Sequence, residues 1–396
     1  MYRSSLCCQA LTTGVLLCAL AGNSLAGQQI PSAQRAYDAG LRLETAGRHE
    51  EAARKFQEAI DINPEFVDAY YQLGSSQLLA GKTEDGIKAF LQLAQIDPGN
   101  EKAVLAAADA YRGLELYDDA LALYSRALRL DPKSALVHYD VGYVLFQKKE
   151  YDGAIAELER AVSIDPSHIP AQRLLASACL AAGNAVAAQK RLEEGIVRNP
   201  GSPELRADLA DFFFSSHRVS EAEQEFRAAL VVRPDYGPAQ LGLAKLHRRN
   251  GQAALALEEA SAVLSREPDN PAAMIEKGQC EYALGSWDAA ARDFETVSRV
   301  DPNDAESEYL LGLLDLTTRR YASAIRHLKQ AVQKDEKFAD AYYYLAEAYS
   351  RNHQTVAARE ALNHCLAIDA TDKRAIALRT ALSAQDTPTR DHDKSK

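Results

Sequence analysis

The chain has 396 residues, of which 47% are hydrophobic and 26% are charged, and its formal net charge is −11. These proportions are those of an ordinary folded protein. The acidic balance argues against a protein that coats nucleic acid through phosphate contacts.

Residues 1–26 have the pattern of a secretory signal peptide, with a positive charge at Arg3 and an apolar run from Leu11 to Ala21. Small residues offer cleavage after Ala21 or after Ala26, and the second site leaves the apolar run whole. The run is shorter than the ~20 apolar residues of a membrane-spanning helix. We therefore expect an exported protein, periplasmic or secreted, with no integral membrane segment after cleavage. An uncleaved anchor is the alternative.

A unit of 34 residues then recurs ten times over residues 33–372. If the unit is counted from Glu101 as position 1, position 8 is always glycine or alanine and position 20 is nearly always alanine. Position 32 is proline in eight consecutive units, at Pro64, Pro98, Pro132, Pro166, Pro200, Pro234, Pro268 and Pro302. A fixed period of this length is the mark of a solenoid.

Each unit predicts two helices. Side chains suited to capping a helix N-terminus precede the first helix in several units, namely Asn100, Ser134, Ser202, Asn270 and Asp304. Glycine, which tolerates a left-handed turn, follows it at Gly47, Gly81, Gly183, Gly251 and Gly285. The small residues at positions 8 and 20 predict that the two helices approach closely.

This combination of period, small residues and proline resembles the tetratricopeptide repeat family. The resemblance implies an all-α, right-handed superhelical solenoid of helix-turn-helix repeats, whose first helices line a concave groove that holds an extended peptide or a partner helix. It further implies that positions 2, 5, 9 and 12 face that groove. The candidate peptide-binding residues at these positions are Tyr71, Tyr139, Tyr143, Phe146, Arg173, Phe214, Lys245, Arg248, Tyr282, Tyr309 and Tyr343.

Two readings of these residues stay open. The aromatic rings either supply interface anchors in the groove or pack between adjacent first helices. The basic cluster Lys245, Arg248 and Arg249 either meets an acidic side chain or a C-terminal carboxylate, or forms a solvated charged face. The Lys–Asn pair with which family members bind chaperone tails is absent from positions 5 and 9 of every unit.

The C-terminal end needs a cover because a terminal repeat leaves one apolar face bare. Residues 373–384 predict an amphipathic capping helix, and residues 385–396 a disordered tail. Cys179, Cys280 and Cys365 lie in different repeats, too far apart for disulfides. We expect them to be small core residues.

The sequence contains no phosphate-binding glycine loop, no zinc-protease motif and no nucleophile elbow. The repeats also leave no room for a catalytic domain, so we expect no enzymatic activity, cofactor or metal. The favoured function is an exported protein-binding scaffold or adaptor with an unidentified protein or peptide partner. The alternatives are an envelope polysaccharide-binding protein, and a non-catalytic accessory subunit of an envelope enzyme or secretion complex.

Overall fold

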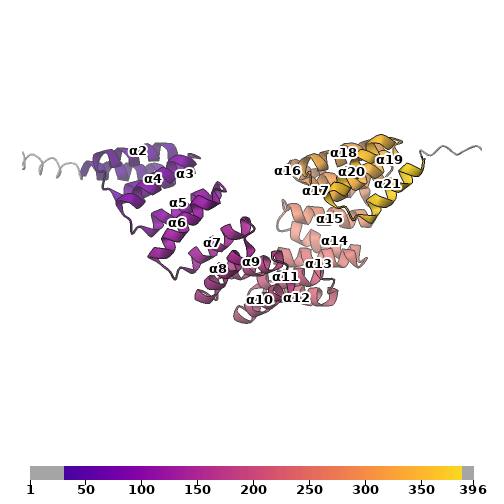
Figure 1. Ribbon diagram of the computed structural model, residues 1–396, viewed down its shortest axis with the longest axis horizontal. Coiled ribbons are helices and arrows are strands. Elements are labelled where there is room, and N and C mark those ends of the chain that lie inside the picture. The colour runs from indigo at the N-terminus through magenta and orange to yellow at the C-terminus, as the bar shows by residue number, and fades with distance from the viewer. Residues whose placement is uncertain (1–30, 386–396) are drawn as a thin grey trace, which may run out of the picture. The chain divides into compact units, whose positions relative to one another are not determined.

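The computed structural model describes residues 31–385, and all regular structure within this range is α-helical. Figure 1 shows the helices following one another in chain order as pairs. The predicted all-α class is therefore confirmed. The predicted signal peptide, residues 1–26, lies outside the described residues, as does the predicted tail beyond Gln385.

The contacts divide the chain into two compact units, residues 1–199 and 200–396. In unit 1 a helix over 31–45 precedes nine more, which are α2 (His49–Ile62), α3 (Val67–Leu79), α4 (Thr83–Ile96), α5 (Glu101–Gly113), α6 (Tyr117–Leu130), α7 (Ala135–Gln147), α8 (Tyr151–Ile164), α9 (Ile169–Ala181) and α10 (Ala185–Arg198).

The described part of unit 2 contains α11 (Pro203–Ser215), α12 (Val219–Val232), α13 (Gly237–Arg249), α14 (Ala253–Leu264), α15 (Pro271–Ala283), α16 (Trp287–Val300), α17 (Ala305–Thr317), α18 (Tyr321–Lys334), α19 (Ala339–Arg351), α20 (Thr355–Ile368) and α21 (Lys373–Gln385). Odd-numbered helices up to α19 are the first helices of repeats, and even-numbered helices are the second. From α2 onward each helix contacts its chain neighbours within its unit.

Small residues hold the two helices of a repeat close together. Ala154, at position 20, is fully buried. A Cβ atom added to Gly142, at position 8 of the same repeat, would lie 2.6 Å from Cγ of Leu158. The large side chains that fill the core beside these seams are fully buried as well, namely Phe56, Phe90, Tyr124, Phe226 and Phe294. The seam thus joins a small residue on one helix to a large one on the other.

All five predicted caps accept a hydrogen bond from a backbone N–H in the first turn of their helix. Asn100, for example, accepts one from Ala103 at 3.1 Å. His168 and Asn184 cap α9 and α10 in the same way, although the sequence did not single them out. These bonds satisfy N–H groups that have no partner inside the helix.

The turn between the two helices of each repeat contains one residue in the left-handed region. In five repeats it is the predicted glycine, with φ between 72° and 79°. In the other five a residue with a side chain adopts φ between 59° and 63°, and these are Glu115, Lys149, His217, Arg319 and His353. The hairpin therefore imposes this backbone conformation on every repeat, whichever residue occupies it.

Cys179, Cys280 and Cys365 are buried and free, as expected of small core residues. At the C-terminal end α21 packs against α20 and α19, and buries Ala375 and Leu382. Gln385, predicted to begin the tail, is the last residue of α21.

Candidate functional site

The predicted groove residues all lie on first helices, and none is fully buried. Nine are half-buried, whereas Arg173 and Lys245 are exposed. Unit 1 holds Tyr71 on α3, Tyr139, Tyr143 and Phe146 on α7, and Arg173 on α9; unit 2 holds Phe214, Lys245, Arg248, Tyr282, Tyr309 and Tyr343. Five of the candidates thus lie in unit 1 and six in unit 2.

In unit 1 the rings of α7 are anchored on neighbouring helices while part of each stays in solvent. The Tyr139 ring lies 4.9 Å from the ring of His168, which caps α9. The Phe146 ring lies 5.7 Å from that of Tyr151 on α8. The guanidinium of Arg112 on α5 lies 5.5 Å from the Tyr143 ring centre. The rings thus pack on neighbouring helices and also present surface, so both readings stay open.

A cluster of charged side chains lies beside these rings. Asp109 accepts hydrogen bonds from Arg112 Nη2 at 3.1 Å and from the Tyr124 hydroxyl at 2.6 Å. Asp140 on α7 is buried, and its Oδ1 lies 3.9 Å from Arg112 Nη1. Burial, reinforced by the charge of Asp109 and opposed by Arg112, raises the pKa of Asp140 to about 6.

In unit 2 the structure brings Phe214, Lys245 and Arg248 together in one pocket of about 410 Å³, which we call the α13 pocket. Its other lining residues are Arg249, Ala272, Ile275, Glu276, Gln279 and Glu306. They come from the first helices α11, α13, α15 and α17. The first helices of four successive repeats therefore build a shared surface within this unit.

Arg248 is committed to a partner inside the protein. Its Nε and Nη2 donate to the two carboxylate oxygens of Glu276, at 2.6 and 3.2 Å. Glu276 is only 1% exposed and lies at position 6 of the next repeat. Arg112 and Asp140 occupy the same two positions in unit 1. An arginine at position 12 followed by an acid at position 6 of the next repeat is therefore a sequence pattern that could have predicted these pairs.

Lys245 and Arg249 are placed differently. The Arg249 guanidinium lies 4.5 Å from the centre of the Phe214 ring. Neither cation forms an ion pair with any residue in the range 31–385. The pocket thus offers two positive charges that have no ion-pair partner in this range. Burial raises the pKa of Glu306, and the charge of Lys245 opposes that rise, so Lys245 is attracted to this carboxylate from beyond ion-pair distance.

The remaining aromatic candidates contact groups within unit 2. The Tyr282 hydroxyl lies 2.5 Å from Oγ1 of Thr317. The Tyr309 ring lies 4.8 Å from that of Phe338, and the Arg374 guanidinium of α21 lies 4.7 Å from the Tyr343 ring centre. These rings couple successive repeats and remain half-buried.

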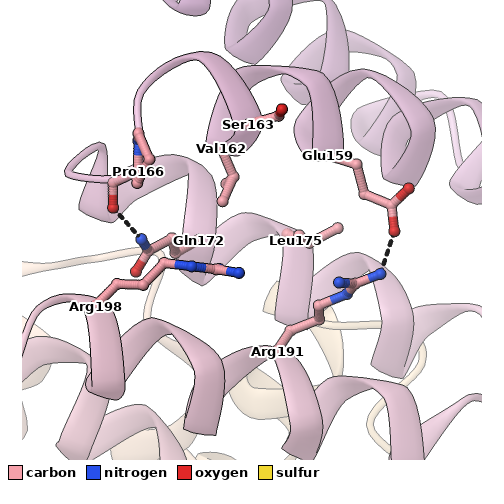
Figure 2. A pocket seen from close by; sticks show the side chains of 8 residues that line it. All are labelled: Glu159, Val162, Ser163, Pro166, Gln172, Leu175, Arg191 and Arg198. Atoms are coloured by element: carbon pink, nitrogen blue, oxygen red, sulfur yellow. Dashed lines mark hydrogen bonds and ion pairs between the residues drawn. The ribbon is translucent and has the colours of Figure 1, made fainter.

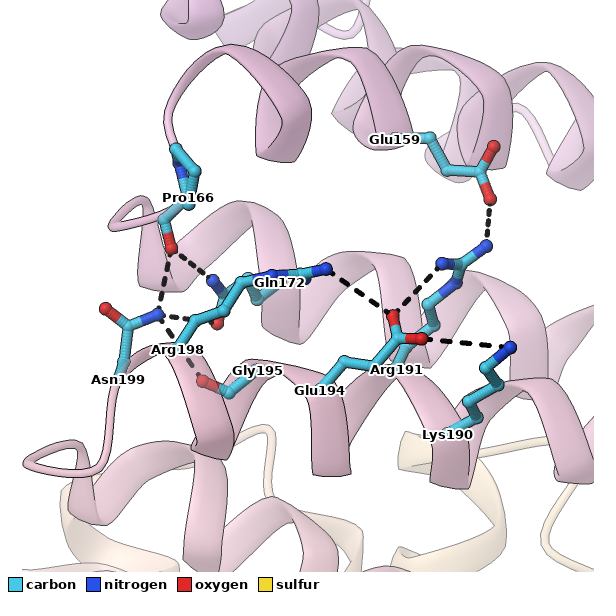
Figure 3. A network of polar contacts seen from close by, with 9 residues as sticks. All are labelled: Glu159, Pro166, Gln172, Lys190, Arg191, Glu194, Gly195, Arg198 and Asn199. Carbon is cyan, nitrogen blue, oxygen red and sulfur yellow. Dashed lines mark hydrogen bonds and ion pairs between the residues drawn. The ribbon is translucent and has the colours of Figure 1, made fainter.

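Unit 1 contains a further pocket that the candidate groove positions, which all lie on first helices, did not predict. This α8–α10 crevice has a volume of about 440 Å³. Figure 2 shows Arg191 and Arg198 of α10 opposite Glu159 and Val162 of α8. In the network of Figure 3 the Glu194 carboxylate lies 3.3 Å from Arg191 and 3.9 Å from Arg198, and Gln172 donates to the Pro166 carbonyl at 2.6 Å. Arg191 also pairs with Glu159. The cations of this crevice are therefore already neutralised.

The same crevice recurs in unit 2 between α12 and α14. Both crevices are lined by residues at the same repeat positions, namely 25 and 28 of one repeat and 4, 7 and 23 of the next. In unit 1 these are Glu159, Val162, Gln172, Leu175 and Arg191. In unit 2 they are Arg227, Leu230, Gln240, Leu243 and Glu259. The acid and the base have exchanged places. The crevice is thus a product of repeat stacking rather than a singular ligand site.

Comparison with known proteins shows the family. One tetratricopeptide repeat model matches residues 26–101, 105–169 and 241–305, and a second matches 145–207, 180–246 and 316–382. The chain belongs to the tetratricopeptide repeat family.

Relatives within the family are distant. The chain is 30% identical over 138 residues to the CTR9 homolog of Arabidopsis thaliana, covering 34% of this chain and 12% of that protein. It is 22% identical to the BBSome complex member BBS4 of Bos taurus, covering 83% and 56%. The chain thus spans about half or less of the length of these relatives. The crystal structure of yeast Tom70 is similar in fold, with a TM-score of 0.51, 12% identity, and 90% and 96% of the two chains covered.

Between residues 31 and 385, no group of three or more His, Cys, Asp or Glu side chains is placed to hold a metal ion. No helix in that range is long and apolar enough to cross a membrane.

Proposed function

We propose that this tetratricopeptide repeat scaffold is an exported adaptor that holds an extended peptide or a partner helix against its first-helix faces. The family is a protein-binding one, which supports the general role. Export rests on the signal-like pattern of residues 1–26.

The observation that carries the proposal is the arrangement of Tyr139, Tyr143 and Phe146. Packing on neighbouring helices holds these rings in place, yet each keeps part of its surface in solvent. Rigid, half-exposed rings supply contact area at little cost in conformational entropy, which is typical of interface anchors. The relative BBS4 is a member of a protein complex, and this agrees with an adaptor role.

Cross-linked capture in intact cell envelopes tests the proposal. We expect the full chain to be recovered in its processed form with a protein partner. The variant Y139A/Y143A/F146A should lose at least about tenfold of the captured partner, because three anchor rings each contribute more than about 1 kcal/mol. Its helical CD signal should persist.

The matched control replaces three exposed apolar residues of second helices, V186A/V197A/V356A, and should capture the partner normally. If Y139A/Y143A/F146A captures the partner as well as the wild type does, the binding surface lies elsewhere. Recovery of the chain from the cytoplasm alone would remove export from the proposal. Capture of an envelope polysaccharide in place of protein would favour the glycan alternative.

A further inference from the structure

We propose that the α13 pocket binds a side-chain carboxylate of an extended partner segment, with an apolar side chain of that segment beside it. This inference rests on the proposed function and names the chemistry of the partner at one place. Its evidence lies entirely in unit 2.

Lys245 and Arg249 are cations of the pocket without an ion-pair partner among residues 31–385. Basic residues near the end of a first helix usually have partners in this unit. Arg248 is held by Glu276 in two hydrogen bonds, and Arg351, at the same repeat position as Arg249, donates to Glu347 at 2.9 Å. Lys245 and Arg249 form no ion pair within the described part of the chain. Interaction with the helix dipole accounts for a cation in the last turn, but Lys245 lies before that turn.

Arg249 is held in place. Its guanidinium lies over the half-buried Phe214 ring of α11, at 4.5 Å from the ring centre. A guanidinium stacked on a ring keeps its planar N–H edge available, and that edge matches the two oxygens of a carboxylate. Lys245 is four residues earlier and therefore lies on the same side of α13. Together they offer one fixed and one adaptable donor.

The remaining lining sets the orientation of the occupant. Glu306 of α17 also lines the pocket and attracts Lys245 electrostatically. Arg249 has no such partner among residues 31–385, so a carboxylate is favoured on the α13 side near Arg249 and disfavoured near α17. Ala272 and half-buried Ile275 of α15 provide an apolar patch next to it. The adjoining side chain of the occupant is therefore apolar.

The pocket also distinguishes an internal side chain from a chain end. First helices of four successive repeats line it, so its surface continues along the unit on both sides of α13. An extended segment can therefore pass through, with its acidic side chain directed at Lys245 and Arg249. A C-terminal carboxylate has the same chemistry as an acidic side chain, and peptides with blocked and free C-termini distinguish the two.

The test uses the full chain and end-capped hexapeptide pools with a fixed centre. One pool has Leu-Asp at its centre and the other Leu-Asn, and both are acetylated and amidated. Fluorescence anisotropy should show the Asp pool binding about tenfold tighter, as charge-assisted hydrogen bonds provide. The difference should shrink at high salt, because the cations are exposed.

The variant K245Q/R249Q should bind both pools equally and keep its helical CD spectrum. The matched control K329Q/R299Q removes the same charge from exposed positions on α18 and α16, and should keep the preference for Asp. Three results would overturn the inference. The wild type could bind both pools equally, the preference for Asp could survive in K245Q/R249Q, or neither pool could bind. A Leu-Asn pool with a free C-terminus that binds tightest would assign the pocket to a chain end instead. The capture experiment depends on α7 of unit 1, so its result is independent of this one.

Discussion

At the scale of single residues, Asp140 in unit 1 is a buried carboxyl whose proton affinity changes on folding. The folded chain raises the pKa of its carboxyl to about 6, first through burial. An unfolded chain releases this proton near pH ~4. The folded state therefore binds the proton more tightly, so the stabilisation is complete below about pH 4 and is lost as the pH rises through about 6.

The variant Asp140→Asn removes this dependence. We expect the free energy of unfolding of the variant, taken relative to that of the wild type, to be up to about 2 kcal/mol larger at pH 7.5 than at pH 4.5. Urea unfolding followed by helical CD at the two pH values measures the difference. Asp119→Asn, at an exposed position of α6, is the control. An Asp140→Asn gain that is equal at both pH values would show that the carboxyl does not titrate in this range.

The left-handed turn residues provide a second prediction at this scale. Lys149 adopts φ 63° with a side chain, whereas Gly183 adopts φ 79° in the same turn of the next repeat. A side chain there costs about 1–2 kcal/mol of strain, partly offset because glycine loses more entropy on folding. Lys149→Gly should therefore stabilise the chain by about 0.5–1 kcal/mol.

The reverse change, Gly183→Ala, should cost a similar amount, because no atom lies within 4 Å of the added Cβ and only the backbone is strained. Urea midpoints of the two variants are the measurement. If both variants shift in the same direction, backbone strain is not what distinguishes them.

At the scale of the helices, the seam between positions 8 and 20 is the sensitive feature. Ala154 is fully buried on α8, opposite Gly142 of α7. Ala154→Trp should overpack this seam and cost about 1–3 kcal/mol. Thermal unfolding compared with Val186→Trp, which adds the same bulk at a position 82% exposed, isolates the packing effect. Equal melting temperatures for the two variants would contradict the close approach of α7 and α8.

Helix boundaries were predictable where the local sequence carries a physical signal. Asn100 and Asp304 cap their helices because a short polar side chain reaches the free N–H groups. Glu115 and Lys149 adopt left-handed φ although neither residue favours it. The turn that packing imposes overrides local preference there, so no local pattern could have identified these positions.

At the scale of the whole molecule, the 34-residue period predicted a solenoid, since each repeat contacts mainly its neighbours, and the resemblance to the tetratricopeptide repeat family implied that the solenoid is all-α. Side-chain partnerships across repeats were not predictable in the same way. In the sequence Arg248 is one of three neighbouring cations, and only the structure shows that Glu276 neutralises it. Lys245 and Arg249 form no ion pair among residues 31–385. Such pairs depend on the rotation between successive repeats, which the period alone does not specify.

The crevice between α8 and α10 presents an acid from the earlier repeat to a base from the later one, and the crevice between α12 and α14 presents them reversed. A repeat carrying Arg191 therefore suits a predecessor that offers Glu159. If the repeat that carries Arg191 followed the repeat that carries Arg227, the two guanidinium groups would face each other. The charges at these positions thus match each repeat to its neighbour, and repeats of similar shape are not freely interchangeable along the chain.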